Sequence, residues 1–160
     1  MYNSSMTDKR FSIMVLPRRE DGSILLQTWT DEHGIITDGF GSFYHEHKNL
    51  LETVQKVLVE KINIKAQLVK AAKLQYFIDK PSGLVDLEVT VYFADVVEEI
   101  KNSKEMHWYT ADDIPYEQMH PATEKWLPLL LNGNTTLRAT IKVDQPGHHA
   151  TGRVIEFLVT

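Results

Sequence analysis

The sequence predicts an α+β domain in which two helices pack against strongly twisted β-sheets. Three observations carry this prediction. Residues 49–64 place apolar side chains at helical spacing, and residues 123–132 form a second helical segment that ends before Gly133. Most of the remaining chain consists of strand-like runs of β-branched and aromatic residues separated by turn formers.

Composition limits the class of protein. The chain has 160 residues, 42% of them hydrophobic and none of them cysteine, with a formal net charge of -5. This length suits one domain, residues 11–160, after a flexible polar tail at residues 1–10 that lacks the apolar core of a signal peptide. The negative charge and the lack of a ~20-residue apolar run argue against general nucleic-acid binding and against membranes. We therefore expect a cytoplasmic protein whose partners are small molecules or proteins.

The first half of the chain predicts a hairpin followed by a helix. FSIMVL (residues 11–16) and SILLQTW (residues 23–29) have the composition of strands and are joined by the turn REDG. TDEHGIITDGFGS (residues 30–42) mixes turn formers with a short apolar piece. In the helix that follows, Asn49 is the expected N-cap and Asn63 is expected to close it in the left-handed conformation.

The second half predicts mainly strands. Two long strand-like segments are separated by DKPSG, whose proline and glycine suit a tight reversal. A short strand precedes the second helix, and two closing strands flank the loop DQPGHHAT. The expected strands are residues 66–78, 84–97, 106–110, 136–143 and 152–159, and the expected helix is residues 123–132.

The first helix contains a charged residue in an unexpected place. At ~100° per residue, Glu52, Lys56 and Glu60 lie opposite the apolar arc, but Lys61 falls inside it. Either the stem of Lys61 packs along the edge of the core while its ammonium reaches water, or its charge serves a binding site. Lys56 and Glu60 also have the i, i+4 spacing of a surface ion pair, worth ~0.3 kcal/mol.

Two segments resemble a known family. GFGS at residues 39–42, followed by a helix that ends in KVLVEKINI, resembles the Nudix box. Residues 104–131 resemble the corresponding segment of the MutT-related oxidised-purine nucleoside triphosphate diphosphatases. The resemblance runs from Phe11 to the C-terminus. It implies the Nudix fold, an α/β/α sandwich of mixed, twisted sheets packed between helices.

The resemblance also implies a site for Mg²⁺ or Mn²⁺ in active members, where glutamates of the box helix hold the ion against a substrate diphosphate. Glu60 matches a retained glutamate, Glu105 matches a further metal-binding carboxylate, and these two residues are the catalytic candidates. Gly41 is the third metal-site candidate, because a glycine in GFGS lets the backbone approach the phosphate closely and present a carbonyl or amide to the site. Two other glutamate positions are Val57 and Lys61 here, so the box is degenerate. Valine has no ligand atom, and lysine repels a cation but attracts phosphate. Lys61 is therefore expected to stand in for the missing ion.

The same resemblance indicates which residues contact a ligand. Lys56 occupies the arginine position of the box. In the oxidised-purine enzymes the segment matching MHPATEKW carries a tryptophan and two acidic residues that bind the base, whereas here those positions are His120, Ala122 and Thr123. We therefore do not expect the oxidised-purine specificity. The substrate-binding candidates are Asp38, which matches a base-contacting position, with Gly41, Lys56, Lys61 and His120.

The sequence is compatible with three functions. We expect a protein that binds a nucleotide or another diphosphate-containing small molecule, with hydrolysis severely reduced or lost. The first alternative is an active Mg²⁺- or Mn²⁺-dependent hydrolase that converts a nucleoside triphosphate to the monophosphate and pyrophosphate through its residual carboxylates. Its metal site would include His45 or His47, whose i, i+2 spacing on an extended segment suits a transition metal. The second alternative is a module that binds a protein partner.

Overall fold

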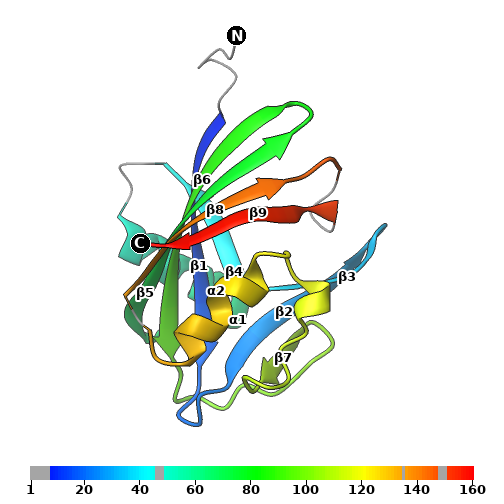
Figure 1. Ribbon diagram of the computed structural model, residues 1–160. Helices are drawn as coiled ribbons and strands as arrows, with labels where there is room; N and C mark the ends of the chain where they lie inside the picture. Colours follow the sequence, from blue (N-terminus) through cyan, green and yellow to red (C-terminus); the bar gives the residue numbers. More distant parts are fainter. Residues whose placement is uncertain (1–7, 46–48, 135, 148–150) are drawn as a thin grey trace.

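The computed structural model describes residues 8–45, 49–134, 136–147 and 151–160 (Figure 1). The helices are α1 (Leu50–Ile62), α2 (Thr123–Leu131) and the short 3-10 helix η2 (Tyr116–Gln118). The strands are β1 (Asp8–Arg18), β2 (Ile24–Asp31), β3 (Gly34–Asp38), β4 (Phe40–Tyr44), β5 (Gln67–Lys80), β6 (Gly83–Asp95), β7 (Met106–Tyr109), β8 (Leu137–Asp144) and β9 (Arg153–Val159).

The described strands form one mixed sheet. Their order is β3-β2-β1-β6-β5-β8-β9, with β4 paired to β1 and β7 paired to β2. β1 runs parallel to β6 and β5 runs parallel to β8, whereas the other pairs are antiparallel. Figure 1 shows α2 in front of this sheet, in the space between β9 and β2.

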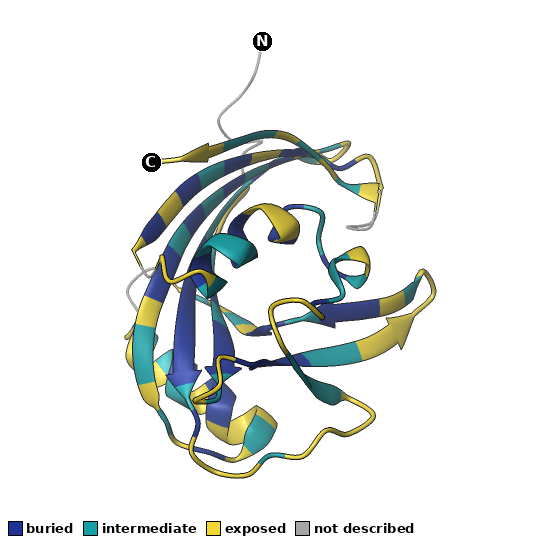
Figure 2. Ribbon diagram, turned by 60° about the horizontal axis from the view of Figure 1, so that its bottom comes forward, coloured by how far each residue is buried: buried dark blue, intermediate teal, exposed yellow. Residues whose placement is uncertain are grey.

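The sheet separates two hydrophobic cores, one under each helix. Alternation along β1 sends Ile13 and Val15 into the core shared with α1, and Met14 and Leu16 toward the core shared with α2. Figure 2 shows the buried residues concentrated in the central strands and on the inward sides of the helices. The α/β/α arrangement expected from the resemblance is therefore confirmed, with a single mixed sheet as its middle layer.

Both helices and the first hairpin match the predictions. Asn49 caps α1 by accepting a hydrogen bond from the Glu52 backbone N–H, and Asn63 closes the helix in the left-handed region with φ 53° and ψ 44°. The turn between β1 and β2 is closed by the Arg19 N–H, which donates to the Ser23 carbonyl at 2.9 Å. In the described part of the chain, neither helix is long and apolar enough to cross a membrane.

The segment predicted as turns with a short apolar piece contains two strands, β3 and β4. Their signal is weak in the sequence because each strand has only five residues and a glycine separates them. Gly39 allows β4 to cross to β1, since a Cβ atom there would lie 2.7 Å from Met14 Cγ. β1 also begins at Asp8, three residues before the expected domain boundary, and it pairs with β6 from that residue on.

Candidate functional site

A cleft lies between the end of β4 and one side of α1. Its volume is about 350 Å³, and polar side chains form most of its wall. β4 brings its last residues to the cleft through its antiparallel pairing with β1, and α1 begins only a few residues further along the chain. The lining residues are Ser42, Phe43, Tyr44, His45, Asn49, Glu52, Thr53, Lys56, Val57 and Glu60.

The polar side of α1 forms one wall of this cleft. Glu52, Lys56 and Glu60 are spaced four residues apart, so they lie one above another on the helix surface. Lys56 Nζ lies 3.9 Å from Glu60 Oε1. The helical wheel predicts only that this side of α1 faces away from the core, and it does not predict that a cleft lies there. Glu52 and Thr53 were therefore missed as site residues, although the four-residue spacing of charges contains the signal.

Val57 and Lys61, which the resemblance places at two glutamate positions of the box, are in different environments. Val57 is only 5% exposed and packs in the α1 core, with its edge in the cleft wall, so the cleft has an apolar side chain there. Lys61 is exposed in the last turn of α1 and is not among the residues that line the cleft. Lys56 is the lysine that lines it. In the last turn of the helix, Ile62 packs against the core under α1, whereas Lys61 is exposed.

The other predicted metal ligands do not meet Glu60 in this cleft. Gly41 is exposed on β4, where a Cβ atom would lie 3.0 Å from the Ile13 carbonyl oxygen, and only its neighbour Ser42 lines the cleft. Glu105 is also exposed, and its carbonyl accepts the Thr28 N–H at 2.7 Å, which places it beside β2. Neither Gly41 nor Glu105 lines the cleft.

The cleft does not fit a resident magnesium cluster. Mg²⁺ is held in proteins by several oxygen ligands in a near-octahedral arrangement. Lys56 separates the carboxylates of Glu52 and Glu60 along the helix, and its ammonium is next to Glu60. Among the described residues, no three His, Asp or Glu side chains are grouped as a metal site. His45 lines the cleft, whereas His47 lies outside the described residues.

A second group of functional candidates surrounds Tyr76 in the core under α2. The Trp126 indole N–H donates to the Tyr76 hydroxyl at 2.9 Å, and both side chains are buried. The ring of His120 meets Tyr76 edge to face, with centroids 5.7 Å apart. His120 Nδ1 accepts the Ala122 N–H at 3.0 Å, which fixes the ring orientation at the start of α2. His120, predicted from the sequence, is therefore a neighbour of a buried tyrosine.

Asp38 belongs to the same region. Burial of its carboxyl raises the pKa of Asp38 to about 6, although the Gly39 N–H that donates to Oδ1 at 2.8 Å acts in the opposite direction. Burial also raises the pKa of Tyr76 above its usual range, and the charge of Asp38 adds to that effect. A carboxyl with this pKa changes protonation close to neutral pH, so it can accept a hydrogen bond when ionised and donate one when protonated.

A hydrogen-bonded chain of polar side chains runs beside this region. The Thr37 hydroxyl donates to Gln118 Oε1 at 2.8 Å, and the Thr28 and Thr37 hydroxyl oxygens are 3.1 Å apart. The Gln27 amide donates to the Gly39 carbonyl at 2.9 Å. These bonds connect β2, β3 and η2. The local sequence contains no signal for these hydrogen bonds, because the residues that form them are distant along the chain.

The fold established above is the Nudix fold. The mutator MutT protein from Bacillus halodurans superposes with a TM-score of 0.71 at 16% identity, covering 94% of this chain and 97% of that one. A Nudix hydrolase from Nitrosomonas europaea gives 0.60 at 11% identity over 91% and 82% of the two chains. A possible asymmetric diadenosine tetraphosphate hydrolase from Jonesia denitrificans gives 0.56 at 14% identity over 79% and 96%. By sequence, the chain matches no protein-family model and no curated protein.

Proposed function

We propose that this protein binds a nucleotide, or another diphosphate-containing small molecule, in the cleft between β4 and α1, and that it hydrolyses this ligand very slowly or not at all. The observation that carries the proposal is the placement of Lys56 between Glu52 and Glu60 on the cleft wall. The fold supports the ligand class, because one structure with the same fold is described as a possible asymmetric diadenosine tetraphosphate hydrolase.

The charges of the cleft suit a nucleotide that carries its own magnesium. Lys56 supplies a positive charge for a phosphate oxygen, and its side chain is 74% exposed and free to turn toward a ligand. Glu52 and Glu60 repel bare phosphate but attract the hydrated Mg²⁺ that nucleotides bind in solution. We therefore propose that the ligand enters as its magnesium complex, with the ion belonging to the ligand.

Asp38 and His120 are proposed to read the base or another polar ring of the ligand. The carboxyl of Asp38 changes protonation near pH 6, so its hydrogen-bonding character depends on pH within the range of ordinary buffers. The imidazole of His120 is held by the Ala122 N–H and by the edge of Tyr76.

Slow hydrolysis follows from the chemistry of the cleft wall. Attack of water on a diphosphate is accelerated when metal ions neutralise the phosphates and activate the water, and that stabilisation is worth several kcal/mol. Val57 contributes no oxygen ligand, and the Glu60 carboxylate has an ammonium beside it. We expect turnover to be lower by orders of magnitude than in a site with a full set of carboxylates.

Calorimetric titration with a panel of nucleoside triphosphates and diphosphate-linked nucleotides tests the proposal, together with an assay for released product. We expect saturable binding in Mg²⁺, weaker binding in EDTA, and very slow product release. Rapid turnover that disappears in Glu60→Gln would instead establish the active hydrolase that uses the residual carboxylates. Absence of binding to every compound, with and without Mg²⁺, would eliminate the ligand-binding function.

A further inference from the structure

Three cations surround a small cavity on the face of the sheet opposite the α2 core. The cavity has a volume of about 230 Å³ and lies where β8 begins beside β5. Lys70 and Lys73 come from β5 and Arg138 comes from β8. The other lining residues are Ala71, Ala72, Thr136 and Leu137. This cavity shares no lining residue with the cleft beside α1.

A β-bulge brings the two lysines to the same face. In a regular strand, residues three apart point to opposite faces. The register of β5 against β6 shifts between Lys70 and Ala72, so Lys70 is opposite Tyr92 while Lys73 is opposite Thr90. Because these two β6 residues are two positions apart, both lysines lie on one face of the sheet. The inserted residue therefore gathers charges that a regular strand would separate.

Arg138 joins them through the pairing of β5 with β8. Arg138 is the direct partner of Lys73 in the parallel ladder, and the preceding pair, Ala72 with Leu137, is buried in the core under α2. Alternation then places Lys73 and Arg138 side by side on the opposite face. Like charges at directly opposite positions destabilise a sheet. A bound anion would relieve the repulsion between these two cations.

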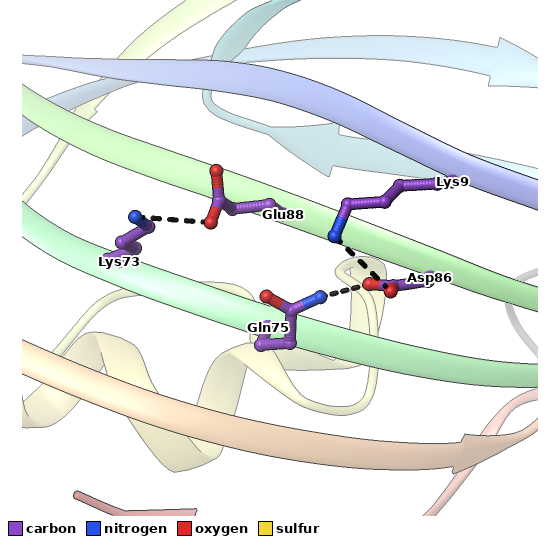
Figure 3. Close-up of polar contacts among 5 residues, drawn as sticks. All are labelled: Lys9, Lys73, Gln75, Asp86 and Glu88. Carbon is purple, nitrogen blue, oxygen red and sulfur yellow. Dashed lines mark hydrogen bonds and ion pairs between the residues drawn. The ribbon is translucent and has the colours of Figure 1, made fainter. Parts of the chain in front are cut away.

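The carboxylates of this face do not neutralise the cluster. Lys73 forms an ion pair with Glu88 (Figure 3), with 3.2 Å between Nζ and Oε1, whereas Lys70 and Arg138 have no ion pair with a carboxylate in the described part of the chain. Several other cations on this and neighbouring strands are paired: Lys9 of β1 with Asp86 (Figure 3), Lys142 of β8 with Glu156 and Arg153 of β9 with Asp144. One carboxylate therefore faces three cations, in a chain whose formal net charge is -5.

The volume of the cavity leaves room for a compact anion. Ala71 and Ala72 also line the cavity, and both residues are buried in the core under α2. Thr136 lies on the rim and is exposed, so its hydroxyl is available to donate a hydrogen bond. Three cations and a hydroxyl around a space of this size match the acceptor-rich surface of a phosphate group.

We propose that Lys70, Lys73 and Arg138 form a second binding site, specific for a phosphate group carried by a soluble metabolite or by a lipid headgroup. Lys73 keeps Glu88 as a partner and would share its charge, whereas Lys70 and Arg138 would bind the phosphate oxygens directly. The guanidinium of Arg138 is suited to two parallel hydrogen bonds with such a group. The site shares no lining residue with the cleft in which the nucleotide is proposed to bind.

The test is a titration of the full chain with inorganic phosphate at constant ionic strength, followed by ¹H–¹⁵N NMR. We expect saturable shifts at the amides of residues 70–73 and 136–138. Lys70→Gln with Arg138→Gln should raise the dissociation constant at these amides by about tenfold or more, since each charged hydrogen bond is lost. Arg153→Gln is the matched control, because it removes one arginine from the neighbouring strand outside the cavity, and it should change the constant by less than about twofold.

A second arm identifies the source of the phosphate. Co-sedimentation with phosphatidylcholine vesicles, with and without phosphatidic acid, should show Arg138-dependent binding only if a lipid headgroup is the natural ligand. Binding of inorganic phosphate without vesicle binding assigns the site to a soluble ligand. Either result supports the site. No shift at these amides at millimolar phosphate, or equal losses of phosphate affinity in Arg153→Gln and in the double variant Lys70→Gln with Arg138→Gln, would overturn it.

Discussion

Lys56 Nζ lies 3.9 Å from Glu60 Oε1, one turn apart on the side of α1 that forms the cleft wall. The two side chains are 74% and 59% exposed, so the pair is held weakly and water screens it. Such a pair stabilises a helix by only about 0.3 kcal/mol. Both charges can therefore be redirected to a bound ligand at little cost in folding free energy.

Glu60→Gln should separate binding from stability. We expect the free energy of unfolding in urea to change by less than about 0.5 kcal/mol, because an exposed i, i+4 pair contributes little. Affinity for a magnesium nucleotide, measured by calorimetry, should fall by about tenfold, since one carboxylate facing the ion is lost. Glu117→Gln, an exposed glutamate of η2 outside the cleft, is the control and should leave the affinity unchanged. Equal affinities for the two variants would remove Glu60 from the site.

Val57→Glu tests whether this position belongs to the core. Val57 is 5% exposed, whereas Val59 on the same helix is 42% exposed. Burying a carboxylate without partners is unfavourable, so Val57→Glu should lower the free energy of unfolding by about 2 kcal/mol or more in metal-free buffer. Val59→Glu should lower it by less than about 0.5 kcal/mol. Urea titrations in EDTA and in Mg²⁺ measure the free energy of unfolding of the two variants. A similar small loss in Val57→Glu and Val59→Glu would contradict the assignment of Val57 to the core.

Asp38 should make stability depend on pH in a defined window. Its pKa is raised from 3.8 to about 6 in the folded protein, so the folded state binds this proton more tightly than the unfolded state does. The wild type should therefore lose stability as pH rises from about 4 to about 6, by up to about 3 kcal/mol at 1.36 kcal/mol per pKa unit, and stay level above that.

Asp38→Asn should lack this loss, because the amide stays neutral across the window. Urea unfolding at intervals from pH 4 to pH 7 gives the difference between variant and wild type, which should be small at pH 4 and favour the variant at pH 7. The exposed residue Asp112 supplies the control variant Asp112→Asn, whose difference from wild type should not change with pH. A pH-independent difference for Asp38→Asn would show that its carboxyl is not buried as described.

The buried hydrogen bond between Trp126 and Tyr76 should appear in a double-mutant cycle. Tyr76→Phe removes the acceptor of the Trp126 N–H, which is left unsatisfied, so we expect a loss of about 1–3 kcal/mol. Trp126→Phe removes the donor and also a large buried volume, so it should cost more. If the bond is real, the double variant should lose less than the sum of the two single losses. Strictly additive losses in urea unfolding would count against it.

Local signals were sufficient for much of the fold. The apolar spacing of α1 and its asparagine caps fixed the helix ends nearly to the residue. The proline and glycine of DKPSG predicted the reversal between β5 and β6, where Lys80 pairs with Gly83. β3 and β4 were missed because their identity as strands depends on partners distant in sequence, such as the pairing of Tyr44 with Phe11.

The site was predictable only in part, for the same reason. A helical wheel separates core from surface but does not show which surface another element covers. Lys61 falls inside the apolar arc of the wheel although it is exposed, whereas the wheel correctly places Glu52 on the exposed side but does not show that it lines a cleft. Asp38 and His120 were found through the family resemblance. Their neighbours Tyr76 and Trp126 come together only through the packing of β5 against α2.

The most direct test of the account compares two lysines of α1. Lys56→Gln and Lys61→Gln each remove one positive charge from an exposed helical position, but only Lys56 lines the cleft. Calorimetric titration with a magnesium nucleotide should show the dissociation constant rising about tenfold in Lys56→Gln and changing less than about twofold in Lys61→Gln. Equal losses in the two variants, or a larger loss in Lys61→Gln, would contradict the placement of the phosphate against Lys56.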